Sequence, residues 1–150
     1  MCWNAITAIS TALSTAAILT TGLIIFYQLR EMRRGTVAQA FSTIASTLYE
    51  QKVRMARRTL MRNSKSDFTS WTQKEIDDAE ITCVKYDVVG TMVRNKMIDL
   101  KMVIKKWRNS LIECYEHAQP MITAYRKNRG NDFWEDFQWL YNKAKEIKTS

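Results

Sequence analysis

Glycine and proline are scarce in this chain of 150 residues, which contains four glycines and one proline. A β-sandwich or β-barrel needs many tight turns, and these two residue types supply most of them. The composition therefore predicts an all-α fold. Once the apolar N-terminal segment is set aside, roughly 120 residues remain, which suffices for one helical core and leaves a second globular domain unexpected.

Metal-ligating and catalytic residue types are similarly sparse. His117 is the only histidine, and Cys2, Cys83 and Cys114 lie far apart in the sequence, so no metal-ligand spacing exists. We expect no metal and no cofactor, and we interpret the cysteines as reduced packing residues. No serine, cysteine or carboxylate array provides a nucleophile or an acid–base pair, so the sequence does not predict an enzyme.

Charge is absent from the first 29 residues, because Arg30 is the first charged side chain. About 20 apolar residues are enough to cross the hydrocarbon layer of a membrane, so residues 1–29 predict a transmembrane helix with room for tilt. A cleaved signal peptide is the alternative. Such a peptide begins with a positively charged stretch, which this chain lacks.

Positive charge gathers directly after this segment, at Arg30, Arg33 and Arg34. Arginine and lysine are enriched on the cytoplasmic side of membrane helices, so we expect the N-terminus outside and the remainder of the chain in the cytoplasm. We therefore divide the chain into a transmembrane helix with its basic flank, residues 1–34, and a helical cytosolic domain, residues 35–150.

The predicted membrane helix carries a stripe of small, hydroxylated and amide side chains along one face. At 100° per residue this stripe, called the polar stripe below, contains Asn4, Thr7, Thr11, Ser14, Ile18, Thr21 and Ile25. Such residues let membrane helices approach closely and form hydrogen bonds across an interface, so we expect self-association through this face. The stripe could form a packed dimer seam, line a water-filled lumen with Ile18 and Ile25 as the constriction, or simply bond its own backbone.

Apolar residues at helical spacing predict that the long helix continues to Asn63, with Gly35 as the place for any bend. A polar loop over residues 64–70 follows. Thr72 and Glu75 then form a capping box for a helix that ends near Asn95.

Two further helices are expected. The first begins after Asp99 and is kinked or interrupted before Pro120, since proline removes a backbone donor. The second is capped by Asn131 or Asp132.

A basic patch lies in the distal part of the predicted long helix, at Arg54, Arg57, Arg58 and Arg62. The whole chain has a net charge of +8, which favours anionic surroundings. If the helix stays upright, the patch lies about 30 Å beyond Arg34 and cannot reach lipid headgroups. Its candidate partners are RNA or the acidic stretch 75–80 of an adjacent subunit, and the alternative is a solvated face. Stacking aromatics of single-strand binders are missing here.

Arg108, Asn109 and His117 form the only arginine-to-histidine arrangement that could support nuclease chemistry. They resemble the HEPN ribonuclease signature, in which a histidine follows an arginine after four to six positions. Here the spacing is nine, so on one helix the two side chains differ by about 180° and lie roughly 13 Å apart along the axis. They could converge only through a helix break or across subunits.

Several motifs give the chain a wider resemblance. They are Tyr27-Gln28-Leu29-Arg30, Tyr86-Asp87-Val88-Val89-Gly90 with Val93-Arg94, Trp107, Tyr115, Pro120, and Phe133-Trp134-Glu135-Asp136-Phe137-Gln138-Trp139-Leu140. With them the chain resembles a family of small bacterial membrane proteins known mainly as a domain of unknown function. Its architecture is also similar to the membrane accessory proteins of type VI-B CRISPR loci, which carry a divergent HEPN-like domain.

The CRISPR resemblance implies a homo-oligomeric pore that permeabilises the inner membrane when an RNA-guided partner detects infection. Arg108 and His117 would then be structural or regulatory. A membrane-tethered scaffold or binding module without a pore is the alternative function, and a divergent HEPN-type ribonuclease is the third.

Overall fold

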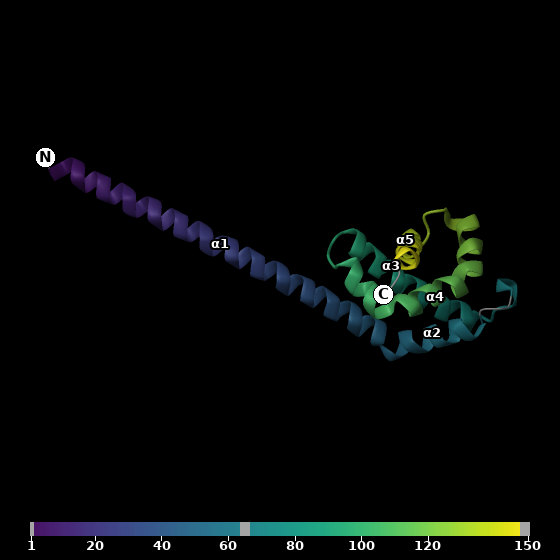
Figure 1. The fold of residues 1–150 in the computed structure, drawn as a ribbon. Coiled ribbons are helices and arrows are strands. Elements are labelled where there is room, and N and C mark those ends of the chain that lie inside the picture. Colours follow the sequence, from purple (N-terminus) through teal and green to yellow (C-terminus); the bar gives the residue numbers. More distant parts are fainter. Residues whose placement is uncertain (1, 64–66, 148–150) are drawn as a thin grey trace. The chain divides into compact units, whose positions relative to one another are not determined.

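The computed structural model describes residues 2–63 and 67–147, without the side chains of residues 2–10, 12 and 63. Over these residues the chain is helical and contains no strand, so the predicted all-α class is confirmed. The elements are α1 (Cys2–Tyr49), α2 (Gln51–Asn63), the short 3-10 helix η1 (Phe68–Ser70), α3 (Gln73–Arg94), α4 (Leu100–Arg129) and α5 (Glu135–Glu146) (Figure 1). The chain divides into two compact units, Met1–Gln39 and Ala40–Ser150.

The first unit consists of the greater part of α1. Every described side chain from Leu13 to Thr36 is exposed, so within the described residues of this unit nothing covers the apolar surface. The helix continues without interruption at Gly35, where an added methyl group would meet nothing within 4 Å. α1 is the one described helix that is long and apolar enough to cross a membrane.

The prediction of one helix to Asn63 is wrong, because α1 ends at Tyr49 and α2 begins at Gln51. The reason lies in the phase of the apolar residues. Leu48 and Leu60 both belong to the buried core, yet on one straight helix they would point about 120° apart. Breaking the helix at Glu50 lets both side chains enter the same core, and this burial outweighs the local preference for helix.

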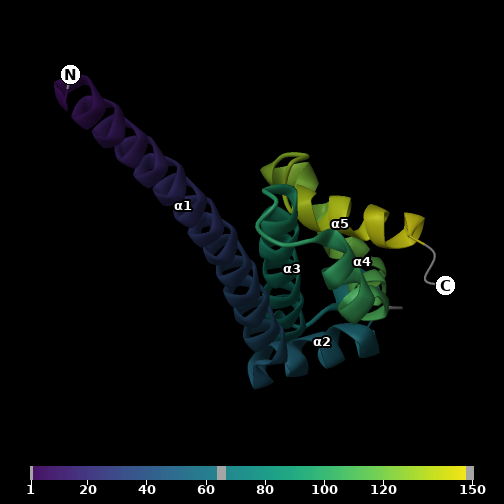
Figure 2. The same cartoon turned by 60° about the vertical axis from the view of Figure 1, so that its left-hand side comes forward.

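The second unit is built around α3, which contacts α2, α4 and α5. Figure 2 shows α2 crossing α3 near one end and α5 lying near the other. The largest fully buried side chains come from all the long helices of this unit and include Leu48, Leu60, Tyr86, Ile104, Leu111 and Phe137. Aromatic rings also pack in this core. The rings of Tyr86 and Phe137 are stacked, with their centroids 5.2 Å apart.

Two predicted helix starts are confirmed. The hydroxyl of Thr72 accepts a hydrogen bond from the backbone N–H of Glu75, and the Glu75 carboxylate accepts one from the backbone N–H of Thr72 at 2.7 Å. Asp99 caps α4 by accepting a hydrogen bond from the backbone N–H of Lys101. Of the predicted loop, residues 64–66 lie outside the described residues, and Asp67 caps η1.

α4 is not interrupted at Pro120, so that part of the prediction is wrong. Proline removes a single donor, and Pro120 is exposed, so water can bond the carbonyl that loses its partner. Buried Ala118, Met121 and Ile122 hold the helix on both sides. The ribbon of α4 changes direction along its length (Figure 1), as expected for a proline kink.

The predicted cap of the last helix is also wrong. α5 begins at Glu135, and its N-cap is Trp134 in the left-handed region, with φ 56° and no side-chain hydrogen bond of its own. Residues 131–134 form turns instead, with Asp132 accepting the backbone N–H of Glu135 through its carbonyl oxygen. Burial of Trp134 explains the later start, because the indole must turn into the core before the helix begins.

Candidate functional site

The polar stripe lies on the exposed first unit. Thr11, Ser14, Ile18, Thr21 and Ile25 are all exposed, and Ile18 and Ile25 expose 72% and 50% of their surface. Asn4 and Thr7 belong to α1, but their side chains lie outside the description. The described stripe residues are therefore available to a neighbouring helix or to lipid.

Several described threonine hydroxyls of this helix donate to their own backbone. Thr15 donates to the carbonyl of Thr11 at 2.9 Å, Thr20 to that of Ala16 at 2.8 Å and Thr21 to that of Ala17 at 2.8 Å. A hydroxyl group bonded in this way already donates its one hydrogen bond, but the lone pairs of its oxygen atom can still accept another. The donors therefore need no neighbouring helix, while the oxygen atoms still offer a polar surface to one.

The basic flank is solvent-exposed. Arg34 pairs with Glu31 across one helical turn at 3.3 Å, and both side chains are mostly exposed, so the pair contributes little to stability. Arg30 and Arg33 line a hollow of about 310 Å³ with Phe26 and Leu29. Cationic groups beside apolar ones suit the boundary between a membrane and water.

Arg57, a member of the predicted basic patch, is half-buried and holds a hydrogen-bond network. Its guanidinium donates to the Leu48 carbonyl at 2.7 Å, to the Ser110 hydroxyl at 3.2 Å and to the Tyr86 hydroxyl at 3.3 Å. Tyr86 and Ser110 bond each other at 2.8 Å. We call these four residues the Arg57 junction, since they join the last turn of α1 to α2, α3 and α4.

The junction solves a problem at the end of α1. The last carbonyls of a helix lack intrahelical partners and carry partial negative charge, and α1 has no basic residue in its last turn. Arg57 supplies both the donor and the charge from the next helix. Sequence reasoning missed this role, and the only signal was the phase mismatch between Leu48 and Leu60.

The tyrosine and cysteine side chains near the junction are unreactive at neutral pH, because their pKa values are raised. Burial raises the pKa of the Tyr86 hydroxyl to about 12 and that of the Cys114 thiol to about 12. Burial also raises the pKa of the Cys83 thiol well above its ordinary value. The thiols stay protonated and poorly nucleophilic at neutral pH. Cys83 and Cys114 are free and buried, as predicted, and the Cys2 side chain lies outside the description.

The rest of the predicted basic patch is on the surface of α2. Arg54, Arg58 and Arg62 are exposed. The predicted distance of the patch from Arg34 assumed a straight helix, and the break at Glu50 removes that assumption. The patch is therefore a property of α2 within the second unit.

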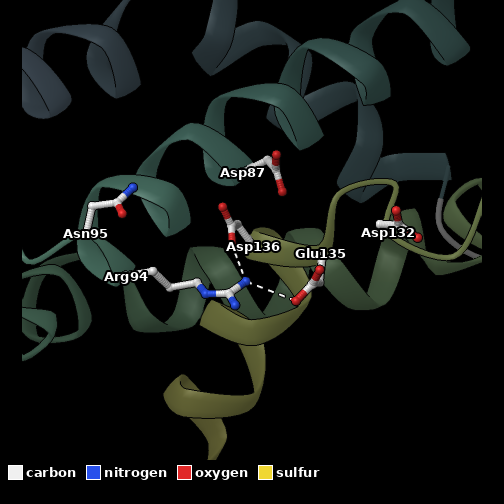
Figure 3. Close-up of a pocket in the computed structure, with 6 residues that line it drawn as sticks. All are labelled: Asp87, Arg94, Asn95, Asp132, Glu135 and Asp136. Atoms are coloured by element: carbon white, nitrogen blue, oxygen red, sulfur yellow. Dashed lines mark hydrogen bonds and ion pairs between the residues drawn. The ribbon is translucent and has the colours of Figure 1, made fainter.

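An open, polar hollow of about 380 Å³ lies where α3 meets the start of α5. It is lined by Asp87, Arg94, Asn95, Asp132, Glu135 and Asp136. Figure 3 shows Arg94 reaching from α3 toward the carboxylates of Glu135, at 3.0 Å, and of Asp136. Thr91 also donates to Asp136. Most of these polar groups are thus used within the protein, which favours a structural role.

Asp87 supplies the cap that α5 lacks. Its carboxylate accepts the backbone N–H of Phe137 at 2.9 Å, and burial raises the pKa of this carboxyl group above its ordinary value. Gly90, one turn along α3, lets the backbone of Asp136 approach closely, because a Cβ atom there would meet that backbone. In the described residues, 2–63 and 67–147, no group of three or more histidine, cysteine or carboxylate side chains is placed to hold a metal.

Arg108 and His117 are not brought together. Both lie on the uninterrupted α4, nine residues and about 13 Å apart along its axis on opposite sides. Arg108 instead donates through Nε to the carbonyl of Ala144 near the end of α5, at 2.9 Å. Asn109 is exposed. Within one chain this arrangement favours a structural arginine over a nuclease pair.

We expect Arg108→Gln to lower the free energy of unfolding by about 1–2 kcal/mol, because the Ala144 carbonyl loses a charged donor. His117→Gln should change it by less than about 0.5 kcal/mol, because His117 makes no comparable hydrogen bond to any residue that the structure describes. Urea unfolding of the full chain in detergent, followed by tryptophan fluorescence, measures both. Equal losses from the two variants would contradict this assignment and point to a joint role.

Comparison with known families and proteins adds one assignment. Residues 12–144 match the model of a family described as a domain of unknown function, DUF4760, so the chain belongs to this family. No curated protein and no solved structure matches the chain. The family match spans part of α1 and nearly all of the helical domain, so both belong to what the family shares.

Proposed function

We propose that this member of the DUF4760 family is a single-pass protein of the bacterial inner membrane that assembles into a homo-oligomeric pore. One observation carries the proposal: the described polar-stripe side chains are all exposed on a helix long and apolar enough to cross a membrane. Small and hydroxylated residues favour close helix contacts in lipid, where apolar surfaces have no preference for each other. Copies of the same stripe are therefore natural partners.

The direction of insertion follows from the basic flank. Arg30, Arg33 and Arg34 are exposed directly after the apolar segment, which supports a cytoplasmic position for the helical domain and an external N-terminus. The lipid bilayer is then a partner along the face opposite the stripe.

Within an assembled ring, the stripe would face the lumen. The lone pairs left on Thr21 after its bond to Ala17 can accept hydrogen bonds from water, and Ile18 and Ile25 would form the narrow apolar section that gates by dewetting. Asn4 and Thr7 would lie toward the outer mouth. A dimer leaves no room for such a lumen, whereas six or more helices nearly demand one.

Antiphage defence is the setting that the resemblance to type VI-B accessory proteins supports. In that setting an RNA-guided effector would signal infection, and the pore would permeabilise the inner membrane. Deletion of a neighbouring effector gene should then abolish permeabilisation without changing the amount of this protein.

A membrane-tethered scaffold is the second candidate, and the back-bonded hydroxyls favour it. Thr15, Thr20 and Thr21 satisfy their donors within α1, so the helix could remain alone in lipid. For a scaffold, exchanging residues 1–29 for an unrelated transmembrane helix would preserve function. For a pore, the same exchange would abolish it.

The pore predicts unequal effects from two adjacent substitutions. Thr21→Leu should remove most dye leakage from vesicles that contain the full-length protein, because a bulky apolar side chain would enter the lumen. Thr20→Leu should leave leakage nearly unchanged, because Thr20 lies about 100° away, toward lipid. The pair is well matched, since both threonines are exposed and bond the backbone four residues earlier at 2.8 Å.

Native mass spectrometry of both variants separates assembly from conduction. We expect Thr20→Leu and Thr21→Leu to form an oligomer with the same subunit number as the unmodified chain. Leakage that survives Thr21→Leu, or a purified protein that is only a monomer or dimer, would overturn the pore in favour of the tether.

A further inference from the structure

A small basic cavity lies on α2 beside α4. Its volume is about 220 Å³, and it is lined by Arg54, Arg57, Arg58, Met61 and Ser110. The four α2 residues follow the spacing that places them on one face of a helix. Three guanidinium groups therefore border one hollow, together with one hydroxyl group.

These positive charges are not balanced inside the protein. No carboxylate lines the cavity, and α2 carries five basic residues and no acidic one. Among the described residues, the exposed guanidinium groups of Arg54 and Arg58 have no hydrogen-bond or ion-pair partner. Like charges gathered around one hollow repel each other, and an anion bound there would relieve the repulsion.

Arg57 also retains capacity for a ligand. A guanidinium has five N–H donors, and the junction uses three of them, on Leu48, Tyr86 and Ser110. Two N–H groups are left. Its position is held by these partners, so a ligand would meet a donor that is already oriented.

The chemistry of the lining selects the ligand. Planar guanidinium groups bind phosphate oxygens in pairs and with better geometry than lysine does. No aromatic side chain lines the hollow, so bases would find no stacking surface. We propose that this cavity binds a terminal phosphate group, that is, a phosphate monoester on a small molecule or on a lipid headgroup.

Phosphate binding in this cavity would affect the C-terminal end of α1. The Arg57 side chain that would contact the phosphate is the one that holds the Leu48 carbonyl at the end of α1. A bound phosphate would restrict this side chain and reinforce the Arg57 junction, which lies within the second unit. Phosphate binding would therefore stabilise the end of α1 where it packs in the second unit.

The test uses the full-length protein in phosphatidylcholine nanodiscs, titrated with glycerol 3-phosphate by calorimetry. We expect saturable binding that Arg54→Gln with Arg58→Gln weakens by about tenfold or more, which corresponds to about 1.4 kcal/mol. The matched control is Lys52→Gln with Arg62→Gln, which removes the same charge from the same helix outside the cavity and should change the affinity less than about twofold. Circular dichroism checks that both double variants keep their helix content.

Two further arms identify the source of the phosphate and the limits of the proposal. If nanodiscs containing phosphatidic acid shift the unfolding temperature and glycerol 3-phosphate does not, the cavity takes a lipid headgroup. Equal weakening in both double variants would mean that net charge alone attracts anions and would overturn the site. Affinity for single-stranded RNA that rises with its length, and that both double variants reduce equally, would assign the basic face to RNA instead.

Discussion

Replacing Gly90 with alanine is expected to destabilise the helical domain by about 3 kcal/mol, at the upper end of what overpacking a core costs. A Cβ atom at this position would lie 2.3 Å from the backbone oxygen and 2.6 Å from the carbonyl carbon of Asp136. Those atoms belong to the first turn of α5, so no change of side-chain rotamer relieves the clash. The start of α5 would have to move away from α3.

The higher helix propensity of alanine stabilises the variant, but this gain is smaller than the cost of the steric clash. Alanine is favoured over glycine by about 1 kcal/mol in a helix interior, so the net loss remains clear. Movement of α5 would also lengthen the bond between Asp87 and the Phe137 N–H and disturb Thr91 with Asp136. The effect should therefore exceed that of a single contact.

Gly35→Ala is the matched control, because Gly35 is also inside a helix but a Cβ atom there meets nothing within 4 Å. We expect no loss of stability from it. Urea unfolding followed by tryptophan fluorescence suits the measurement, since Trp71, Trp107, Trp134 and Trp139 all lie in the second unit. Equal unfolding midpoints for the two alanine variants would show that α5 tolerates the displacement.

Local patterns were enough to predict much of the helical domain. The Thr72–Glu75 capping box and the helix start after Asp99 depend on residues three or fewer positions apart, and both are confirmed. The close contact at Gly90 could also be expected, because a helical glycine often marks an approaching backbone. These features arise from short stretches of chain, so a single sequence contains the information that specifies them.

Long-range contacts explain the failures. The break at Glu50 exists because Leu48 and Leu60 share a core. The start of α5 at Glu135 depends on burial of Trp134 and on Asp87 from α3. The distant residues that cause the break and cap α5 cannot be inferred from the sequence next to either position. The motifs at Tyr86–Gly90 and Phe133–Leu140 proved to be the two sides of this α3–α5 contact, which their sequence separation had concealed.

The candidate sites divide in the same way. The polar stripe follows from helical periodicity alone, so its described members lie where the sequence placed them, exposed along α1. The basic patch did not survive intact, because Arg57 turned inward to the junction while Arg54 and Arg58 stayed exposed. A run of like charges on a helix does not reveal which of its side chains will be partly buried and bonded to the rest of the domain.

Arg57→Met is expected to lower the free energy of unfolding by about 2–3 kcal/mol, the range for losing hydrogen bonds to a charged group. The Leu48 carbonyl would lose its 2.7 Å donor, and the end of α1 would lose the only positive charge that contacts it through a hydrogen bond among the described residues. Methionine fills a similar volume, so the loss reports polar contacts more than packing. Tyr86 and Ser110 would keep their mutual bond at 2.8 Å, which limits the damage.

Two comparisons decide whether the junction, and not charge alone, stabilises the domain. Arg58→Met removes the same charge from the adjacent exposed position and should change stability by less than about 0.5 kcal/mol. Arg57→Lys keeps the charge but lacks the planar fork that reaches three acceptors, so it should rescue only part of the loss. Full rescue by lysine would mean that the positive charge near the end of α1 is sufficient. Equal losses from Arg57→Met and Arg58→Met would instead assign the effect to the general charge of α2.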